Sequence, residues 1–482
     1  MKPLLVVDSP KRWPLKIPET ELVSSYDYLA DPKLAEGAGR KVFNLCRSFR
    51  YQAAGYYVSL LAEARGHRPL PSVSAIQDLR LAPMLKIVSQ DLDELIQTNL
   101  RRIKSDTFEL SIYFGHNLAA GHESLATAIF NAFPAPLLRA KFERHGTWKL
   151  VSVRVIGLGD VPDSHRNFVV EQAERYLRRA PRKSKAAAPT KYDLAILHDP
   201  NDPLPPSSVE TLKQFVAAGE SVGIACDLIR KDAYGRIAEY DALFIRETTN
   251  VNHHTYRFAR RAEAEGMVVI DDPRSILRCT NKVYLAETLA RHRIATPKTL
   301  ILSRDNAEAG LRSLGFPCVL KRPDSSFSAG VSRCDTEKDA PGMLASFFEE
   351  SDLLVAQEYV PTDFDWRIGT LGGEVLFASC YDMAPGHWQI VERDASGGVH
   401  QGDFTTVAVS AVPPEVIKLA IRAAKTMGDG LYGVDLKVVK GKPVVIEVND
   451  NPNIDVGVED AAIGDELYRR IMQHIFWKLE AR

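Results

Sequence analysis

Two strand-like runs near the end of the chain constrain its fold more than any other feature. The stretch YGVDLKVVKGKPVVIEVNDNP, residues 432–452, has mostly alternating apolar and polar side chains on both sides of a Lys-Gly-Lys sequence. A three-residue loop with its glycine in the left-handed conformation predicts a β-hairpin centred on Gly441. In that hairpin Asp435 lies directly opposite Glu447, so two carboxylates meet across the strands.

The opposed acids require a neighbouring positive charge. Directly opposed side chains have Cβ atoms ~4.5–5.5 Å apart, and like charges in that position destabilise a sheet. A hard divalent cation removes the repulsion, because Mg²⁺ prefers carboxylate and amide oxygens and keeps its other positions for water and phosphates. Asn449 lies opposite Gly433 and on the same face as Glu447, where it adds a neutral oxygen. Asp435, Glu447 and Asn449 therefore predict a magnesium site.

The same hairpin has a simpler interpretation. Asp435 and Glu447 could face solvent and pair with Lys437 or Lys440. The opposite face of the second run carries apolar side chains expected to enter a core: Val444, Ile446 and Val448. From the residues alone, both interpretations stay open.

Composition limits the class of protein. The chain has 482 residues, more than the ~250–300 at which a single core stops growing, so we expect several domains. Its 61 basic and 62 acidic side chains leave no overall field to recruit nucleic acid or a membrane. The six cysteines form no CxxC pair, and the N-terminal apolar run is too short for a signal peptide. We therefore predict a cytoplasmic protein without a nucleic-acid or membrane partner.

A basic, Ala- and Pro-rich stretch marks the expected linker between domains. In the first domain we predict strands at 4–8, 108–115 and 148–157 and a helix over 38–66. Beyond the linker, strands (192–199, 221–227, 240–247 and 268–272) alternate with helices (207–219 and 255–266), which predicts a small parallel sheet. A helix over 275–292 leads into the last region. The predicted domains are 1–177, a linker 178–191, 192–275 and 276–482.

Several stretches together resemble the ATP-grasp ligases. The hairpin is similar to the one that holds magnesium in that family through an Asp, a Glu and an Asn. The segment CVLKRPDSSFSAGV resembles the phosphate-binding strand and loop, and TNKVYLAETLARHRIATP resembles the entry helix. The resemblance implies that Lys282 and Lys321 reach the phosphates of ATP, while the backbone closes over them at Ser326, Ser328 and Gly330.

The segment VAQEYVP is similar to the adenine hinge of the same family. This implies that residues Gln357, Glu358, Tyr359 and Val360 lie along the base, with Glu358 hydrogen-bonding to it.

Within the fold the RimK-like branch is the most similar. The segment DWRI implies that Asp365 lies near the ribose and Arg367 near the reacting phosphate. RimK-like ligases usually carry a further Arg-containing segment, and residues 380–406 depart from it. Arg393 could supply that cation, and His387 and Trp388 could line an acceptor pocket or be ordinary loop residues. The region before the linker resembles an extra N-terminal domain found in a subset of these proteins.

The resemblance implies an α/β protein with the ATP-grasp fold: a pre-ATP-grasp domain and two α+β subdomains that clasp ATP, preceded by an additional α/β domain. It implies a carboxylate–amine ligase that uses ATP and Mg²⁺, or Mn²⁺, and forms an amide through an acyl phosphate. The catalytic residues would be Arg367, Lys321 and Arg393. Glutamate or a similar amino acid would join a peptide, small-molecule or protein C-terminal carboxylate. The alternatives are an ATP-binding regulatory module and a phosphotransferase, and a homo-oligomer stays open.

Other motifs carry less weight. GDGLYG, residues 428–433, satisfies G-x-G-x-x-G but follows a helix and precedes a strand, which is the reverse of a Rossmann turn. We interpret it as a helix cap and loop. His253 and His254 could suggest a metal, but adjacent residues on a helix do not face one another, so we expect polar residues at a helix start.

Overall fold

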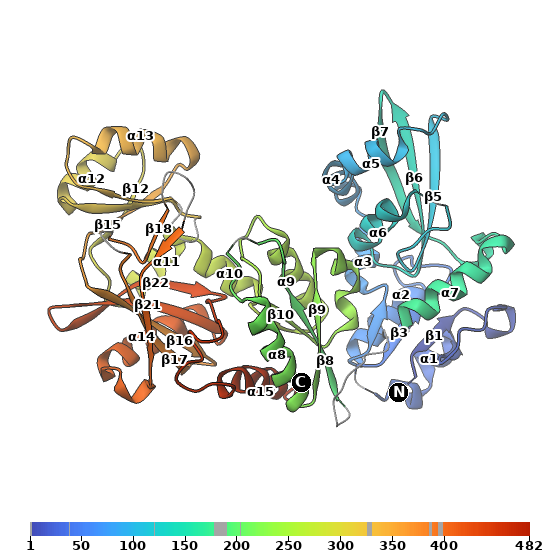
Figure 1. Ribbon diagram of the computed structural model, residues 1–482. Helices are drawn as coiled ribbons and strands as arrows, with labels where there is room; N and C mark the ends of the chain where they lie inside the picture. The colour runs from blue at the N-terminus through green and yellow to red at the C-terminus, as the bar shows by residue number, and fades with distance from the viewer. Residues whose placement is uncertain are drawn as a thin grey trace. The chain divides into compact units, whose positions relative to one another are not determined.

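The computed structural model describes the chain except residues 1, 38, 120, 178–189, 203, 325–329, 385–387 and 394–398. Its described residues form two compact units (Figure 1): Met1–Lys185 with Tyr234–Ala238, and Ala186–Ala233 with Glu239–Arg482. The predicted domain ranges stay a prediction, because most of the expected linker is not described. Among the described helices, none is long and apolar enough to cross a lipid bilayer.

The first unit begins with a parallel sheet. Across the sheet its strands are β2 (Glu21–Ser24), β1 (Leu4–Val7), β3 (Lys41–Asn44) and β4 (Arg68–Leu70). The helices that accompany it are α1 (Ser25–Ala30), α2 (Ala54–Ala64) and α3 (Val73–Asp78). Every residue of the central strand β1 is buried, as expected of a strand covered on both faces.

The prediction of one helix over 38–66 is wrong. That stretch contains the strand β3, a loop and then α2. Val42 and Phe43 are buried, and a short apolar run of this kind fits a buried strand as well as a buried helix. The sequence pattern alone could therefore not separate the two.

An antiparallel sheet completes this unit. It consists of β5 (Thr107–Tyr113), β6 (Leu137–His145) and β7 (Thr147–Val155), which confirms the strands predicted near 108 and 148. The helices of this part are α4 (Ala82–Asp91), α5 (Asp93–Leu100), α6 (Glu123–Ala132) and α7 (Arg166–Leu177). Short 3-10 turns of the unit are η1 (Pro10–Arg12), η2 (Pro32–Ala35), η3 (Leu158–Asp160) and η4 (Asp163–His165).

The second unit contains the predicted parallel sheet. Across it lie β11 (Val268–Ile270), β10 (Ala242–Ile245), β8 (Tyr192–Leu197) and β9 (Ile224–Ile229), with helices α8 (Val209–Ser221), α9 (His254–Ala264) and α15 (Glu466–Glu480). The 3-10 segment η5 (Lys231–Glu239) follows β9 along the chain, and its residues Tyr234–Ala238 belong to the first unit. The chain passes from β8 to β9 and then returns to β10 on the other side of β8. The strand order therefore reverses between β8 and β10.

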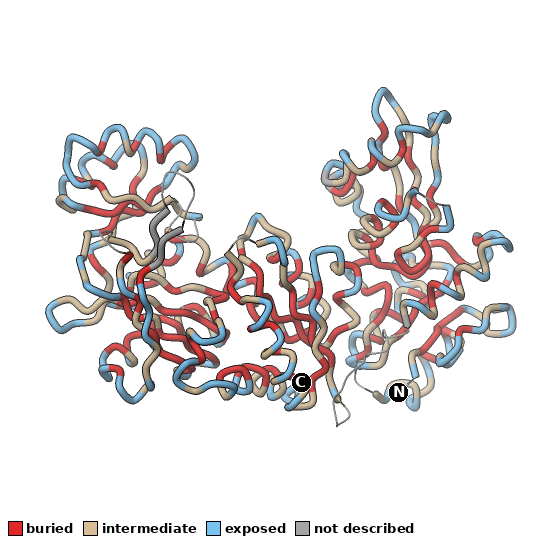
Figure 2. The backbone as a smooth tube through the Cα atoms, in the orientation of Figure 1, coloured by how far each residue is buried: buried red, intermediate tan, exposed pale blue. Residues whose placement is uncertain are grey.

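Two larger antiparallel sheets and a two-stranded one, formed by β18 (Val391–Arg393) and β19 (Val399–Gln401), complete the described strands of this unit. One of the larger sheets contains β12 (Thr299–Leu302), β15 (Leu354–Glu358), β13 (Cys318–Lys321) and β14 (Val331–Cys334), with α12 (Ala307–Leu314) and α13 (Ala340–Glu350). The other contains β20 (Phe404–Val407), β17 (Glu374–Asp382), β16 (Phe364–Leu371), β21 (Leu431–Val439) and β22 (Lys442–Asp450), with α14 (Pro414–Met427). A short 3-10 turn, η6 (Val409–Ala411), also belongs to this part. Figure 2 shows that burial concentrates on the strands of these sheets.

The helix predicted over 275–292 is two helices, α10 (Pro273–Thr280) and α11 (Lys282–Arg291). The break falls at Asn281, whose side-chain oxygen accepts a hydrogen bond of 3.0 Å from the backbone N–H of Tyr284. Asparagine is a favoured N-cap residue, and here it also donates a hydrogen bond of 2.8 Å to Asp324. The break makes Lys282 the first residue of α11.

A buried arginine ties the end of β10 to the segment that follows β22. Arg246 is only 1% exposed and donates hydrogen bonds of 2.6 Å to Asn451 Oδ1 and 2.9 Å to the carbonyl of Pro452. It also donates to the carbonyl of Pro206 at 2.6 Å and to Ser207 Oγ at 2.8 Å. The guanidinium thus joins three chain segments that are far apart in the sequence.

We predict that Arg246→Met lowers the free energy of unfolding of this unit by about 3–5 kcal/mol, because it leaves buried acceptors without their charged partner. The matched control is Arg257→Met on the exposed face of α9, which should change that free energy by about 0.5 kcal/mol or less. Urea unfolding of both variants measures the difference. Equal unfolding midpoints for the two variants would contradict this role.

Candidate functional site

The hairpin of β21 and β22 has the predicted register at its acids. Asp435 pairs with Glu447, and Gly433 pairs with Asn449. The turn differs from the prediction, because the connection is a two-residue loop. Lys440 and its following glycine both have positive φ angles, 49° and 77°, which is the type I′ geometry that matches strand twist.

A β-bulge restores the register that the shorter turn would have shifted. Leu436 pairs with Val445, whereas Asp435 pairs with Glu447, so Ile446 is an extra residue on β22. Without the bulge, a one-residue slip would turn the side chains of one strand to the other face. Asp435 and Glu447 therefore lie opposite one another because the bulge cancels the one-residue shift in register that the shorter turn introduces.

The bulge also changes which apolar residues enter the core. Val445 and Val448 are fully buried in the core beneath the sheet. The prediction that Val444, Ile446 and Val448 share the core face is wrong for the first two, because Val444 is half-buried and Ile446 lines a cavity.

The two acids are neutralised by cations from other elements. Arg367 of β16 donates two hydrogen bonds to Asp435, from Nε at 2.8 Å and from Nη2 at 3.0 Å. Lys282 Nζ lies 2.9 Å from Glu447 Oε1. Asn449 Nδ2 donates to Asp435 Oδ2 at 3.1 Å. The acids and the amide thus converge on one point.

The alternative pairing with lysines of the hairpin does not hold for Lys437. Its Nζ lies 2.5 Å from Asp365 Oδ1 and donates to Thr362 Oγ1 at 2.7 Å. Burial raises the pKa of Asp365, while the neighbouring Lys437 opposes that effect. Asp365 is therefore held by Lys437 of β21 and by Thr362, which precedes β16 and donates to Asp365 Oδ1 at 3.0 Å.

Burial and charge oppose one another at the acid pair. Burial works against the charged form of Glu447, but Lys282 and Lys321 together hold the pKa of Glu447 below its ordinary value. Burial likewise opposes the charge of Arg367, and the Asp435 carboxylate more than compensates, so the pKa of Arg367 is raised. The site thus keeps Glu447 and Arg367 ionised although both side chains are half-buried.

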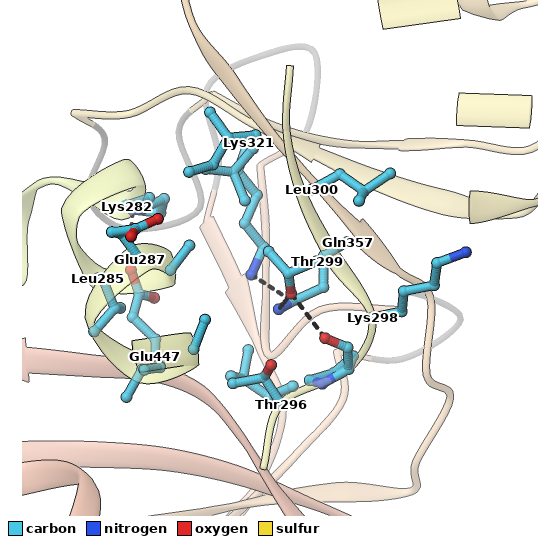
Figure 3. A pocket seen from close by; sticks show the side chains of 17 residues that line it. Lys282, Leu285, Glu287, Thr296, Lys298, Thr299, Leu300, Lys321, Gln357 and Glu447 are labelled. Atoms are coloured by element: carbon cyan, nitrogen blue, oxygen red, sulfur yellow. Dashed lines mark hydrogen bonds and ion pairs between the residues drawn. The ribbon is translucent and has the colours of Figure 1, made fainter. Parts of the chain in front are cut away.

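Lys321, the last residue of β13, is held by the neighbouring strand (Figure 3). Its Nζ donates a hydrogen bond of 2.8 Å to Gln357 Oε1, and Gln357 Nε2 donates to Thr299 Oγ1 at 3.0 Å. Burial lowers the pKa of Lys321 to about 8. The side chain of Gln357, expected at the adenine base, here positions the lysine.

The segment from Glu358 to Val360 lines the larger of two adjoining cavities. The backbone N–H of Glu358 donates to the carbonyl of Lys298 at 2.8 Å, and the Glu358 carboxylate accepts from the Lys298 N–H at 3.3 Å. The Tyr359 ring packs edge-on against Trp388, with centroids 5.9 Å apart. Trp388 lines the same cavity, beside this segment.

The cavities bring most of the predicted site residues together. The larger has a volume of about 640 Å³ and the smaller of about 330 Å³. Both are lined by Lys282, Lys321, Gln357, Ile446 and Glu447. The larger is also lined by the other predicted residues that the structure describes there: Glu358, Tyr359, Val360, Asp365, Arg367, Asp435 and Asn449.

Some predicted residues cannot be placed. Ser326 and Ser328 of the phosphate loop and His387 lie outside the described residues. Arg393 ends β18, but its side chain is not described. Gly330 has a φ of 72°, and a Cβ there would lie 3.0 Å from the Arg322 side chain, so the loop end requires glycine.

Sequence reasoning missed several residues of the larger cavity. Lys437 had a signal, because it lies two residues after Asp435 on the same strand and so on the same face. The sequence contains no comparable signal for Tyr381 or Glu459. The Tyr381 hydroxyl donates to the Glu459 carboxylate, and the Arg367 guanidinium carbon lies 5.0 Å from the centre of the Tyr381 ring. These contacts join parts of the chain that no local pattern connects.

The donor set fits a hard divalent cation. Asp435 and Glu447 supply carboxylate oxygens and Asn449 an amide group, which are ligand types that Mg²⁺ prefers. Their arrangement on two adjacent strands leaves the cavity side for other ligands. These residues could therefore hold Mg²⁺ or Mn²⁺ at the cavity wall.

His253 and His254 stand at a helix start, as predicted, but their rings face one another, which the prediction excluded. The rings of His253 and His254 have centroids 3.9 Å apart, and both lie near Glu247. His253 is the N-cap of α9 with an extended backbone, so only His254 is helical. The rule for adjacent helical residues therefore does not apply to this pair.

Two known domain families match this chain. Residues 25–172 match the RimK-like ATP-grasp N-terminal domain, and residues 279–475 match the RimK-like ATP-grasp domain. A probable alpha-L-glutamate ligase 2 of Shewanella denitrificans is 28% identical over 243 residues, 50% of this chain and 77% of that protein. A protein of the same name from Pseudoalteromonas atlantica is 28% identical over 282 residues, 55% of this chain and 90% of that protein.

Solved structures also match. D-alanine–D-alanine ligase from Bacillus anthracis has a TM-score of 0.45 and 16% identity, covering 60% of this chain and 98% of that chain. A RimK domain ATP-grasp protein from Sphaerobacter thermophilus has a TM-score of 0.45 and 17% identity, covering 58% and 98%.

The domain matches agree with the sheets described above. The expected fold, an ATP-grasp fold preceded by an additional α/β domain, is confirmed. The chain therefore combines a RimK-like ATP-grasp domain with the RimK-like ATP-grasp N-terminal domain.

Proposed function

We propose that this protein joins a carboxylate to an amine in a reaction that consumes ATP and requires Mg²⁺. The observation that supports this most strongly is the convergence of Lys282, Lys321 and Arg367 on the acid pair at one cavity. The relatives named probable alpha-L-glutamate ligases make glutamate the first amine to test. The carboxylate would belong to a peptide or small molecule, with a protein C-terminus as an alternative.

The proposed reaction concentrates negative charge in two steps. The substrate carboxylate attacks the γ-phosphate of ATP to give an acyl phosphate and ADP, and the amine then displaces phosphate to form the amide. Lys282, Lys321 and Arg367 would stabilise the charge that develops on the phosphoryl oxygens. When bound, Mg²⁺ supplies further charge neutralisation at the phosphates. None of this requires a side-chain nucleophile.

The ion pairs of the site have a second role in this proposal. In the structure, Lys282 pairs with Glu447 at 2.9 Å and Arg367 pairs with Asp435 at 2.8 Å. Removing the like-charge repulsion in this way lets two carboxylates face one another before substrate arrives. Arrival of Mg²⁺ with the nucleotide would free both cations to turn toward the phosphates.

The reaction is tested by product analysis. Purified protein receives ATP, Mg²⁺, isotopically labelled glutamate and a cell extract that supplies acceptors, and products are identified by mass spectrometry. The proposal predicts ADP together with a new species carrying amide-linked glutamate. ADP with a stable phosphorylated acceptor would instead make the protein a phosphotransferase. No ADP release with any acceptor would favour a regulatory module.

We predict that Glu447→Ala lowers ligation turnover at least about a hundredfold, because the loss of one preorganised charged contact typically costs ~3–4 kcal/mol in the barrier. Glu374→Ala, at an exposed position of β17 in the same sheet, is the matched control and should keep normal turnover. Steady-state ADP release coupled to amide formation measures both. Near-normal ligation by Glu447→Ala would refute the assignment.

We predict that nucleotide binding without metal weakens as pH rises through about 8. Lys321 has its pKa lowered to about 8 by burial, so it is charged below that pH and becomes neutral above it. ATP affinity in EDTA should fall at least about tenfold between pH 7 and 9.5, the loss of one charged hydrogen bond. Lys321→Arg keeps its charge over this range and should flatten the profile. A flat wild-type profile would contradict the role of Lys321.

A further inference from the structure

A second group of polar side chains lies at the carboxyl edge of the parallel sheet. Glu247 follows the end of β10 by two residues, and the pair formed by His253 and His254 begins the next helix, α9. The strand order of this sheet reverses between β8 and β10. In open α/β sheets, ligands bind outside the carboxyl ends of the strands at such a reversal.

The three side chains face one another closely. One ligand-type atom from each of Glu247, His253 and His254 lies within 4.8 Å of the others, and His254 Nε2 is 2.5 Å from Glu247 Oε1. Thr255 Oγ1 lies 3.1 Å from Nδ1 of His253 and so orients that ring. The cluster is therefore compact and partly fixed before any ligand arrives.

Glu247 is buried, with 3% of its surface exposed. Its Oε2 has no hydrogen-bond partner in the described part of the chain, whereas its Oε1 lies against His254 Nε2. Leaving a buried carboxylate oxygen without a partner costs free energy. The unpartnered oxygen of Glu247 thus points to a missing ligand that carries positive charge.

We propose that Glu247, His253 and His254 bind a divalent transition-metal ion such as Zn²⁺. Two imidazoles and a carboxylate form the ligand set of a three-residue zinc site, which leaves a coordination position for water or another ligand. Nitrogen ligands favour such ions, whereas the oxygen ligands at Asp435 and Glu447 favour Mg²⁺. The two sites would therefore differ in the metal they select.

Small movements complete the geometry. Metal–ligand bonds of about 2.0–2.2 Å place the ligand atoms of a tetrahedral site roughly 3.4 Å apart. The spread of up to 4.8 Å must contract slightly, and the 2.5 Å contact must open. The side chain of His254 is 20% exposed, which gives an ion a path to the buried carboxylate.

The ion would hold a loop at the wall of the larger cavity. Residues 248–252 lie between Glu247 and the histidines, so a metal bound to both closes this loop. Two threonines of the loop line that cavity, where Thr248 Oγ1 donates to Asp202 at 2.9 Å and Thr249 Oγ1 donates to Asp450 at 2.7 Å. A bound metal ion would thus fix the positions of Thr248 and Thr249 in the wall of the larger cavity.

The test is titration of the chelator-treated, tag-free full chain with Co²⁺ in excess Mg²⁺, followed by visible absorption. The proposal predicts one equivalent of bound Co²⁺ with the d–d bands of nitrogen ligation, and displacement of this ion by Zn²⁺. His253→Gln and His254→Gln should each weaken Co²⁺ binding by more than the ~10–100-fold that loss of an outer-shell partner costs. This readout does not depend on ligase activity.

Matched variants assign the ion to this site. His292→Gln, at an exposed histidine of the same unit, should leave Co²⁺ binding unchanged, and so should Asp435→Asn in the magnesium site. Thermal unfolding of each variant verifies that it is folded. Zinc K-edge absorption of the wild-type protein provides a second measurement and should show two imidazoles in the first shell. No Co²⁺ binding by wild type, or equal binding by His254→Gln, would overturn the proposal and leave an ordinary His–Glu pair.

Discussion

The opposition of Asp435 and Glu447 across β21 and β22 is the constraint on which the rest of the site depends. Two half-buried carboxylates face one another directly, an arrangement that costs free energy unless positive charge lies nearby. Arg367 and Lys282 supply that charge from β16 and from the start of α11. A pair of this kind is costly to keep for stability alone, because a well-packed hydrophobic replacement is often as stable. Its presence at a cavity wall is better explained by a ligand.

The surrounding architecture serves to hold this pair in place. The bulge at Ile446 corrects the register of the hairpin, and the break at Asn281 makes Lys282 the first residue of its helix. Gln357 holds Lys321 from the neighbouring strand, and Arg246 fixes the segment that leaves β22. Local backbone features and buried polar contacts therefore converge on the same few atoms. The carboxyl edge of the parallel sheet adds a separate cluster of histidines whose chemistry differs from that of the acid pair.

Much of this could be predicted from the sequence, for identifiable reasons. Strand alternation and turn residues located the hairpin, and the landmark segments identified the family, because both signals are local. The turn length was wrong, and the register of the acids held only because an unpredicted bulge compensated for it. The prediction of a helix over 38–66 failed because a short, fully buried strand shows no alternation of apolar and polar residues that would distinguish it from a buried helix. The roles of Gln357, Tyr381 and Glu459 depend on side-chain contacts between distant segments, which no single stretch of sequence encodes.

The central claim is that the acid pair and Asn449 grip a divalent cation that accompanies a nucleotide. The most direct measurement is a crystal structure with Mn²⁺ and a non-hydrolysable ATP analogue, in which anomalous scattering locates the metal. The account predicts a peak roughly 2 Å from oxygens of Asp435, Glu447 and Asn449, with Lys282 and Arg367 turned toward the phosphates. A metal bound elsewhere, with the ion pairs Lys282–Glu447 and Arg367–Asp435 intact, would contradict it.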